Sequence, residues 1–290
     1  MAIPETQLET WSHQGSITNS AATGNSVKTA IEQYTGFPGD ISFEVYLQGS
    51  YKNDTNVYGE SDVDVTVELK SSFYNNLTDE QKAALKFTAS DYGYFKFRDA
   101  VETCLRAYYG TANVQSRNKV FKIAPTTNRL DADVLVCYSY RLYYNPAQEN
   151  DYYKGIAFYT RNENSQIINF PKYHSDNATT KHQNSANWFK PTVRIFKNMK
   201  NHLVNNKGFN KATAQSYFIE CLLSNVPNNQ FWTNYGTTVA NCLNYLLKNN
   251  LDNFKCLNGL RQLWGATKEN WNQVDAKLYL NELVTLWNKW

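Results

Sequence analysis

The chain has 290 residues, enough for one two-lobed protein or two modest domains with a sizeable core. Hydrophobic residues make up 42% of it and charged residues 19%, which excludes a largely disordered protein. The net charge of +3 gives no sign of the basic surface needed for direct DNA or RNA binding. No segment reaches the ~18 consecutive apolar residues of a membrane-spanning helix.

Cysteine usage and the first residues indicate where the protein works. The five cysteines are widely spaced and form no CxxC pair: Cys104, Cys137, Cys221, Cys242 and Cys256. This pattern predicts neither a zinc site nor a disulfide framework. The N-terminus has no basic start followed by an apolar run, so no signal peptide is predicted and we expect a cytoplasmic protein.

The first part of the chain predicts helices followed by strands. Residues 5–35 are expected to be mostly helical, and the turn at 37–40 ends that segment. Apolar and polar residues alternate at 41–47 and again at 62–68, which predicts two strands joined by a loop rich in Gly, Asn and Asp. The later patterns predict helices at 78–88 and 92–109, strands at 119–123 and 130–138, and a hairpin at 155–170.

The second part of the chain predicts a helical lobe. Residues 171–187 are polar and are expected to connect two lobes, with His174 and His182 as loop residues. Helical patterns then follow at 189–205, 211–224, 236–249, 252–264 and 274–289. We therefore expect an α+β fold with a mixed, mainly antiparallel sheet and helices in residues 1–185. Residues 186–290 would form a C-terminal helical lobe.

Asp62 and Asp64 are the first candidates for chemistry. Residues two apart on a strand point to the same face, so the two carboxylates should lie side by side. Such a pair is favourable when a hard cation such as Mg²⁺ lies between the carboxylates. The alternative is a solvent-facing strand with polar residues outward.

Two further motifs support a metal-dependent nucleotide site. Gln48-Gly49-Ser50 ends the first predicted strand, where glycine allows close approach to phosphate; the alternative is an ordinary turn. Asp133 lies in the predicted strand 130–138, and Asp131 on the same face is its competitor. Three such carboxylates could hold two cations for in-line phosphoryl transfer, and Asp133 could also accept the proton of the attacking hydroxyl.

These motifs carry a family resemblance. Gly-Ser, eleven residues, Asp-Val-Asp and a later strand aspartate resemble the DNA polymerase β-like nucleotidyltransferase superfamily. More narrowly, the chain is similar to the bacterial cGAS/DncV-like nucleotidyltransferases. The stretches that carry this likeness are 47–51, 61–65, 132–136, 191–197 and 216–220. The acidic pair is Asp-x-Asp where eukaryotic relatives often have Glu-x-Asp, and no zinc-ribbon insertion is present.

The resemblance implies roles for residues of the helical lobe. Lys197 matches the lysine that contacts the triphosphate, with Lys200 one turn later as the alternative. Ser216 and Tyr217 match a Ser-Tyr pair that serves the triphosphate and stacks on the base. Residue chemistry alone allows other roles: a solvated lysine, and a tyrosine packed against Phe218 and Leu222.

The family function implied is synthesis of a cyclic di- or trinucleotide from NTPs such as ATP and GTP, with release of pyrophosphate. Two nucleotides would bind in the cleft between the lobes, with two Mg²⁺ or Mn²⁺ ions held by Asp62, Asp64 and Asp133. The product would act on a separate effector in bacterial anti-phage signalling (CBASS), and the enzyme would be a monomer. The alternatives are a linear product, nucleotide transfer to RNA, protein or a small molecule, and a non-catalytic nucleotide-binding protein.

Overall fold

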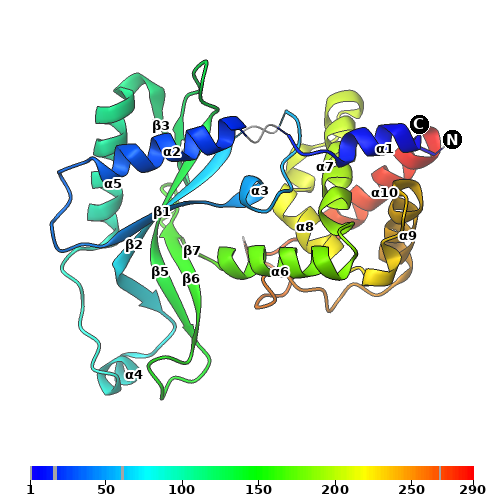
Figure 1. Ribbon diagram of the computed structural model, residues 1–290. Coiled ribbons are helices and arrows are strands. Elements are labelled where there is room, and N and C mark those ends of the chain that lie inside the picture. The colour runs from blue at the N-terminus through cyan, green and yellow to red at the C-terminus, as the bar shows by residue number, and fades with distance from the viewer. Residues whose placement is uncertain (1, 16–17, 60–61, 268) are drawn as a thin grey trace. The chain divides into compact units, whose positions relative to one another are not determined.

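A computed structural model describes residues 2–15, 18–59, 62–267 and 269–290 (Figure 1). The chain folds into two compact units. The sheet unit comprises Ser16–Tyr51 and Ser61–Lys172, and the helical unit comprises Met1–Gly15, Lys52–Glu60 and Tyr173–Trp290. This division differs from the predicted one at residue 185, because the chain passes from one unit to the other four times.

The sheet unit is built on a mixed sheet. Its central pair, β2 and β5, is parallel, and every other strand pair is antiparallel. The order is β1-β2-β5-β4-β3, with β6 pairing with β5 and β7 with β6. The strands are β1 (Phe43–Leu47), β2 (Val63–Asn75), β3 (Val114–Ser116), β4 (Phe121–Ile123), β5 (Ala132–Tyr143), β6 (Tyr152–Tyr159) and β7 (Gln166–Asn169). The predicted α+β class with a mainly antiparallel sheet is confirmed.

Two helices bury the apolar face of this sheet. α2 (Thr18–Glu32) and α5 (Tyr94–Tyr109) contact each other and the central strands (Figure 1). The alternation in β2 places Val63, Val65 and Val67 in the core, where they are at most 1% exposed. Two short helices complete the unit: α3 (Gly49–Lys52) follows β1, and α4 (Asp79–Ala84) begins at a capping box formed by Thr78 and Gln81.

The helical unit is organised around α7 (Phe189–Lys207), which packs extensively against four of the other α-helices. Those four are α1 (Glu5–Ser12), α8 (Ser216–Ser224), α9 (Tyr235–Lys248) and α10 (Gln273–Lys289), and α6 (Pro171–Asn184) precedes α7. Phe189, Val193, Phe196 and Leu203 recur at helical spacing and are buried. None of the helices in the described part of the chain is both long and apolar enough to cross a membrane.

Two sequence-based predictions about this unit were wrong. Residues 171–184 form α6 rather than a linker, because one face of this polar helix is buried through His174 and Ala178. Residues 252–264 form turns and short bridges rather than a helix. Asn258 accepts hydrogen bonds from the backbone N–H groups of Leu260 and Arg261, and Gly259 has a positive φ of 74°, so the chain turns there.

Candidate active site

The predicted carboxylates lie on the two central strands of the sheet. In the parallel β2–β5 pair, Asp64 is in register with Asp133, so the two aspartates are neighbours across the ladder. Asp62 immediately precedes β2, and the Val63 N–H donates to the carbonyl of Asp131 (2.8 Å). The strand register therefore places Asp133 beside Asp64, whereas Asp131 lies at the strand end beside Asp62.

Gly49 lies directly against Asp64. Its φ is +68°, and a Cβ added there would lie 2.0 Å from Asp64 Oδ2, so only glycine fits at this position. The preceding residue is also tied to β2: the Gln48 N–H donates to the Asp64 carbonyl (3.0 Å), and its side-chain Oε1 accepts from the Thr66 hydroxyl (2.7 Å). The Gly-Ser turn and the acidic strand are thus one structure, held together by backbone contact.

The electrostatics of Asp133 fit a bound cation. Burial and the nearby charge of Asp62 raise the pKa of Asp133, while Lys122 and Arg117 oppose the rise. Its Oδ1 atom is buried without a hydrogen-bond partner in the described chain. An orphaned carboxylate oxygen among like charges is an unfavourable arrangement that a hard divalent ion would relieve.

The carboxylates do not form a closed metal cage. Within residues 2–15, 18–59, 62–267 and 269–290, no three His, Cys, Asp or Glu side chains are grouped to hold an ion by themselves. Mg²⁺ is commonly held by one or two carboxylates together with substrate phosphates and water. An all-carboxylate set that leaves coordination positions open fits that mode of binding.

A pocket of about 380 Å³ opens beside these acids. Asp62 and Asp133 line one part of it, and Arg117, Lys119 and Lys122 of the β3–β4 hairpin line another. Its volume lies in the range of small-molecule sites. Lys122 Nζ lies 3.3 Å from Asp62 Oδ2 and 3.7 Å from Asp131 Oδ1, so a cationic side chain already borders the acidic group.

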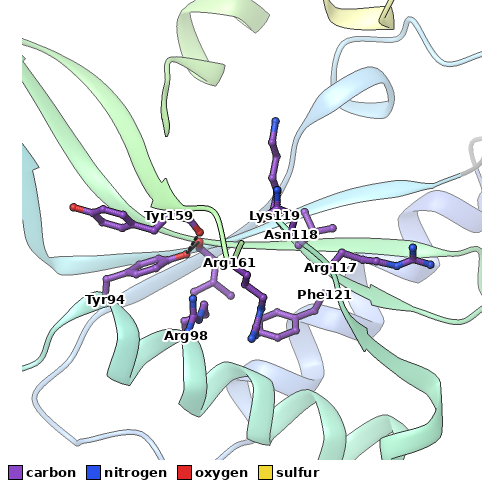
Figure 2. Close-up of a pocket in the computed structure, with 10 residues that line it drawn as sticks. Tyr94, Arg98, Arg117, Asn118, Lys119, Phe121, Tyr159 and Arg161 are labelled. Carbon is purple, nitrogen blue, oxygen red and sulfur yellow. Dashed lines mark hydrogen bonds between the residues drawn. The ribbon is translucent and has the colours of Figure 1, made fainter. Parts of the chain in front are cut away.

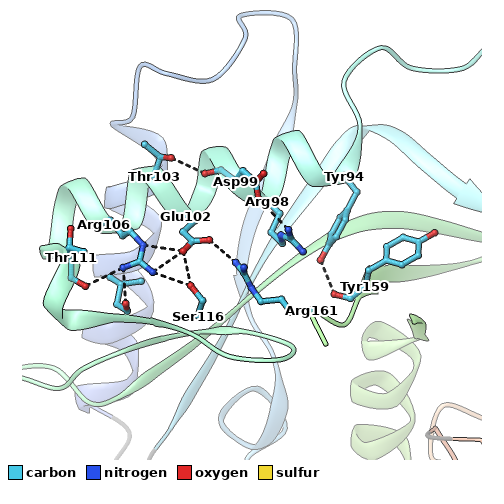
Figure 3. A network of polar contacts seen from close by, with 11 residues as sticks. Tyr94, Arg98, Asp99, Glu102, Thr103, Arg106, Thr111, Ser116, Tyr159 and Arg161 are labelled. Carbon is cyan, nitrogen blue, oxygen red and sulfur yellow. Dashed lines mark hydrogen bonds and ion pairs between the residues drawn. The ribbon is translucent and has the colours of Figure 1, made fainter. Parts of the chain in front are cut away.

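A polar network holds this hairpin in place (Figure 3). Glu102 on α5 accepts from Ser116 Oγ (2.6 Å), from Arg161 (2.6 Å) and from Arg106 (2.8 Å). Partial burial would raise the pKa of Glu102, but the hydrogen bonds from Ser116, Arg106 and Arg161 lower it to about 2. One ionised carboxylate therefore fastens the hairpin to α5 and to the turn after β6.

The hairpin turn also lines a second, much smaller pocket (Figure 2). Tyr94, Arg98 and Tyr159 form part of its wall, and the Tyr94 hydroxyl donates to the Tyr159 carbonyl (3.4 Å). Its volume of about 10 Å³ leaves room for about one water molecule, so a nucleotide does not fit there.

The predicted phosphate-binding lysine lies in the helical unit and is fully buried. Lys197 is 0% exposed, and its Nζ donates to Glu220 Oε1 (2.6 Å) and to the carbonyl and hydroxyl oxygens of Thr55 (3.1 and 3.3 Å). An ammonium group has three N–H donors, and all three have acceptors here. The interpretation of Lys197 as a solvated helix residue is wrong. Lys200, its alternative, is also buried at 1% exposure.

The predicted Ser-Tyr pair begins α8. Tyr217 remains 39% exposed, and its hydroxyl accepts from Asn258 Nδ2 (3.3 Å). Its ring packs edge-on against Phe218 (5.4 Å between centroids) and in a stacked arrangement against His174 (5.1 Å, 26°). The tyrosine is thus packed on one side and accessible elsewhere, so core packing explains only part of its environment.

Sequence reasoning missed several residues of this architecture. Lys122 could have been noticed from its alternation with Phe121 and Ile123, which puts the lysine on the face opposite the core. His174 and Glu220 gave no sequence signal, because their pairing across 46 residues arises only in the fold.

Comparisons with known proteins identify relatives of the whole chain. Residues 176–288 match the family described as cGAS/DncV-like nucleotidyltransferase C-terminal helical domain. The chain is 43% identical over 291 residues to the cyclic UMP-AMP synthase of Rhodothermus marinus, covering 100% of this chain and 99% of the relative. It is 32% identical over 295 residues to the cyclic dipyrimidine nucleotide synthase CdnE of Legionella pneumophila, covering 98% and 97%.

Solved structures give the same result. The Rhodothermus marinus CdnE c-UMP-AMP synthase, solved with Apcpp and Upnpp, superposes with a TM-score of 0.93 at 42% identity, covering 99% of this chain and 97% of that one. The Elizabethkingia meningoseptica CdnE cyclic dinucleotide synthase, solved with GTP and Apcpp, gives a TM-score of 0.80 at 28% identity and covers 98% of both chains.

Proposed function

The chain belongs to the cGAS/DncV-like nucleotidyltransferases, within the CdnE clade, and is a cyclic dinucleotide synthase; we propose that it joins UTP and ATP into cyclic UMP-AMP. The observation that supports this choice of substrates is the 43% identity over the full length to a cyclic UMP-AMP synthase. Each round would form two phosphodiester bonds and release two pyrophosphates. Of the predicted ring sizes, the dinucleotide is the one we retain.

Asp62, Asp64 and Asp133 are the proposed ligands of two Mg²⁺ or Mn²⁺ ions. The fit of these residues rests on the shared register of Asp64 and Asp133 and on Asp133 Oδ1, which has no hydrogen-bond partner within the described part of the chain. When bound, such ions supply charge neutralisation of the triphosphate and activation of the attacking hydroxyl. Asp133 is also the proposed acceptor of the proton of the attacking hydroxyl.

The turn after β1 is the proposed cradle for the triphosphate. Gly49 brings the backbone against Asp64, and Ser50 follows in α3 with a hydroxyl that could donate to a phosphate oxygen. Gln48, which is fixed to Thr66, orients this turn. The positive charges of Arg117, Lys119 and Lys122 around the pocket would favour an anionic substrate there.

Lys197, Ser216 and Tyr217 are the proposed nucleotide contacts of the helical unit. Tyr217 would stack on a base, and Ser216 would serve the triphosphate. Because every donor of Lys197 is occupied, its proposed contact with phosphate requires exchange of the Thr55 oxygens for phosphate oxygens. K197M would then raise the KM for NTP more than K200M does, and equal effects of the two variants would remove Lys197 from the site.

The products separate this proposal from its alternatives. Purified protein would be incubated with Mg²⁺ and each pair of radiolabelled NTPs, and the products mapped with phosphatase and base-specific nucleases. The expected product forms with UTP and ATP together and resists phosphatase. A phosphatase-sensitive product would indicate a linear oligonucleotide, and a product formed with GTP and ATP would overturn the choice of bases.

The proposed setting is bacterial anti-phage signalling of the CBASS type in the cytoplasm. The cyclic dinucleotide would bind a separate effector protein. Two relatives whose structures are known are described as STING-associated, which supports effector signalling as the context. All five cysteines are unpaired, which suits a reducing compartment.

A further inference from the structure

One buried carboxylate joins several segments of the helical unit. Glu220 on α8 is 4% exposed, and its Oε1 accepts from Lys197 Nζ (2.6 Å) and from Thr55 Oγ1 (2.7 Å). Its Oε2 lies 2.8 Å from His174 Nε2. The partners come from α7, from the segment Lys52–Glu60 and from α6, so this carboxylate fastens three separate segments to α8.

The His174 contact leads directly to Tyr217. The His174 ring, 6% exposed, stacks on Tyr217 with centroids 5.1 Å apart and planes inclined by 26°. At its other end, the Tyr217 hydroxyl accepts from Asn258 and contacts the thiols of Cys221 and Cys256. The tyrosine ring is therefore fixed at its hydroxyl end and on one face, while the residue stays 39% exposed.

The Thr55 contact holds the segment that lies in the sequence between Gly49-Ser50 and Asp62-Val63-Asp64. Thr55 is 0% exposed and lies in the chain between Ser50 and Asp62. The neighbouring Asp54 accepts from Lys190 Nζ (2.9 Å), so the segment is held at two successive residues. These contacts tie the short segment to α8 and α7 within the helical unit.

From these contacts, and resting on the nucleotide binding proposed above, we propose that His174 and Glu220 are positioning residues for the nucleotide. The His174 ring backs the face of Tyr217 opposite to the one on which a base stacks. Glu220 holds His174 and Thr55 in place without touching the nucleotide. Fixing an aromatic ring before binding removes the cost of ordering it when the base arrives.

Binding of two probes tests this inference. The dissociation constants of a non-hydrolysable ATP analogue and of inorganic tripolyphosphate, both with Mg²⁺, would be measured by calorimetry for the wild-type protein and for H174A. We expect H174A to weaken the analogue about five- to tenfold and to change tripolyphosphate less than about twofold, because only the analogue carries a base. In turnover, KM rises and kcat is unchanged.

Three further variants complete the design. H174F keeps an aromatic ring behind Tyr217 and should bind the analogue more tightly than H174A. H174Q keeps a hydrogen-bond donor to Glu220 without the ring and should resemble H174A. H202A is the matched control, because His202 lies in the same unit against Trp11 and Trp290 and contacts neither Tyr217 nor Glu220 in the described structure. It should leave both dissociation constants unchanged.

The results that would overturn the inference are distinct from those that would overturn the function. Equal weakening of both probes by H174A, or unchanged binding of the analogue, would exclude the backing role of His174. Wild-type binding of H174Q beside weak binding of H174F would exclude it as well. The proposed function would be overturned, and the inference left intact, if the wild-type protein formed no cyclic dinucleotide. In that case it would still bind the analogue, and the His174 variants would still show the expected dissociation constants.

Discussion

The acidic site of the sheet unit and the buried Glu220 of the helical unit differ in how their negative charges are neutralised by neighbouring groups. Asp62 and Asp133 lie close enough for one to raise the pKa of the other, and Asp133 Oδ1 is buried without a hydrogen-bond partner among the described residues. Burial would raise the pKa of Glu220 too, but Lys197 and His174 hold it well below its usual range. A buried carboxylate oxygen that accepts no hydrogen bond suits a site that binds a ligand, whereas a carboxylate with all its partners in place suits a structural role.

Removing a strand carboxylate should have the largest effect on activity. D64A should lower kcat about a thousandfold or more, equivalent to ~4 kcal/mol of transition-state stabilisation, since a cation ligand is lost. The free energy of unfolding should change much less than the activity, because the Asp64 side chain is only partly buried. Product formation and urea denaturation would measure the two effects.

D131A and D133A distinguish Asp133 of β5 from Asp131, which immediately precedes that strand. D133A should match D64A, while D131A should keep most of the activity. The reverse pattern would move the catalytic assignment to Asp131.

Removing the Glu220 carboxylate, which is paired with Lys197 and His174, should give the largest loss of stability among these variants. E220Q leaves the Lys197 ammonium buried and unpaired, and we expect the free energy of unfolding to fall by ~3–5 kcal/mol. Urea denaturation would measure the loss. E32Q is the control, because Glu32 pairs with Lys28 at the surface, where both side chains are more than half exposed, and should cost less than ~1 kcal/mol. A similar loss in both variants would contradict the central role given to Glu220.

The close contact of Gly49 with Asp64 predicts that G49A lowers both kcat and stability. Its loss of kcat should be smaller than that of D64A, and its loss of stability smaller than that of E220Q. G49A combines a strained positive φ with a methyl group 2.0 Å from Asp64 Oδ2. We expect the free energy of unfolding to fall by ~2 kcal/mol and kcat to fall at least about a hundredfold, because the carboxylate must move. Thermal denaturation and the product assay would measure these changes.

G59A separates the cost of a positive φ in alanine from the cost of a close contact with Asp64. Gly59 also has a positive φ, of 80°, but a Cβ there meets no atom of the described residues within 4 Å. It should lose ~1 kcal/mol and remain active. A G49A protein as active as G59A would show that the close contact is not needed.

The smallest expected effect is that of Lys122 on metal affinity. It tests directly whether the acidic site is one that binds a cation. Lys122 is a cation already beside Asp62, so K122Q should increase the affinity of the nucleotide-free protein for Mn²⁺ by about three- to tenfold. Electron paramagnetic resonance of free Mn²⁺ would measure it. K119Q removes a charge from the same pocket, and no contact between Lys119 and the acids is present in the described structure. A weaker affinity in K122Q than in K119Q would contradict this competition.

Local patterns predicted the acidic face of β2 well because alternation along one strand is local information. The period-two alternation from 62 to 68 was enough to put Asp62 and Asp64 on one side of a strand with valines on the other. The choice between Asp131 and Asp133 was different, since it depends on which residue of β5 stands beside Asp64. That register is set by pairing between strands some 70 residues apart, which a single sequence does not reveal.

The helical unit shows where sequence reasoning stopped. α6 has so few apolar residues that its pattern was interpreted as a linker, yet its buried face contains a histidine paired with a distant glutamate. Lys197 was expected in contact with phosphate or solvent, and a glutamate at 220 gave no sign that it would neutralise that lysine in the interior. Burial of charge depends on the partner, and the partner lies elsewhere in the chain.

The repeated passage of the chain between its two units limits how this protein can evolve by exchange of parts. A fragment beginning at residue 173 would lack α1, whose Glu5 caps the start of α9 and whose Leu8 is fully buried in the core. It would also lack Asp54 and Thr55, which supply acceptors to Lys190 and Lys197. Recombination at a single junction would therefore transfer an incomplete helical unit, so exchange of that unit needs more than one junction.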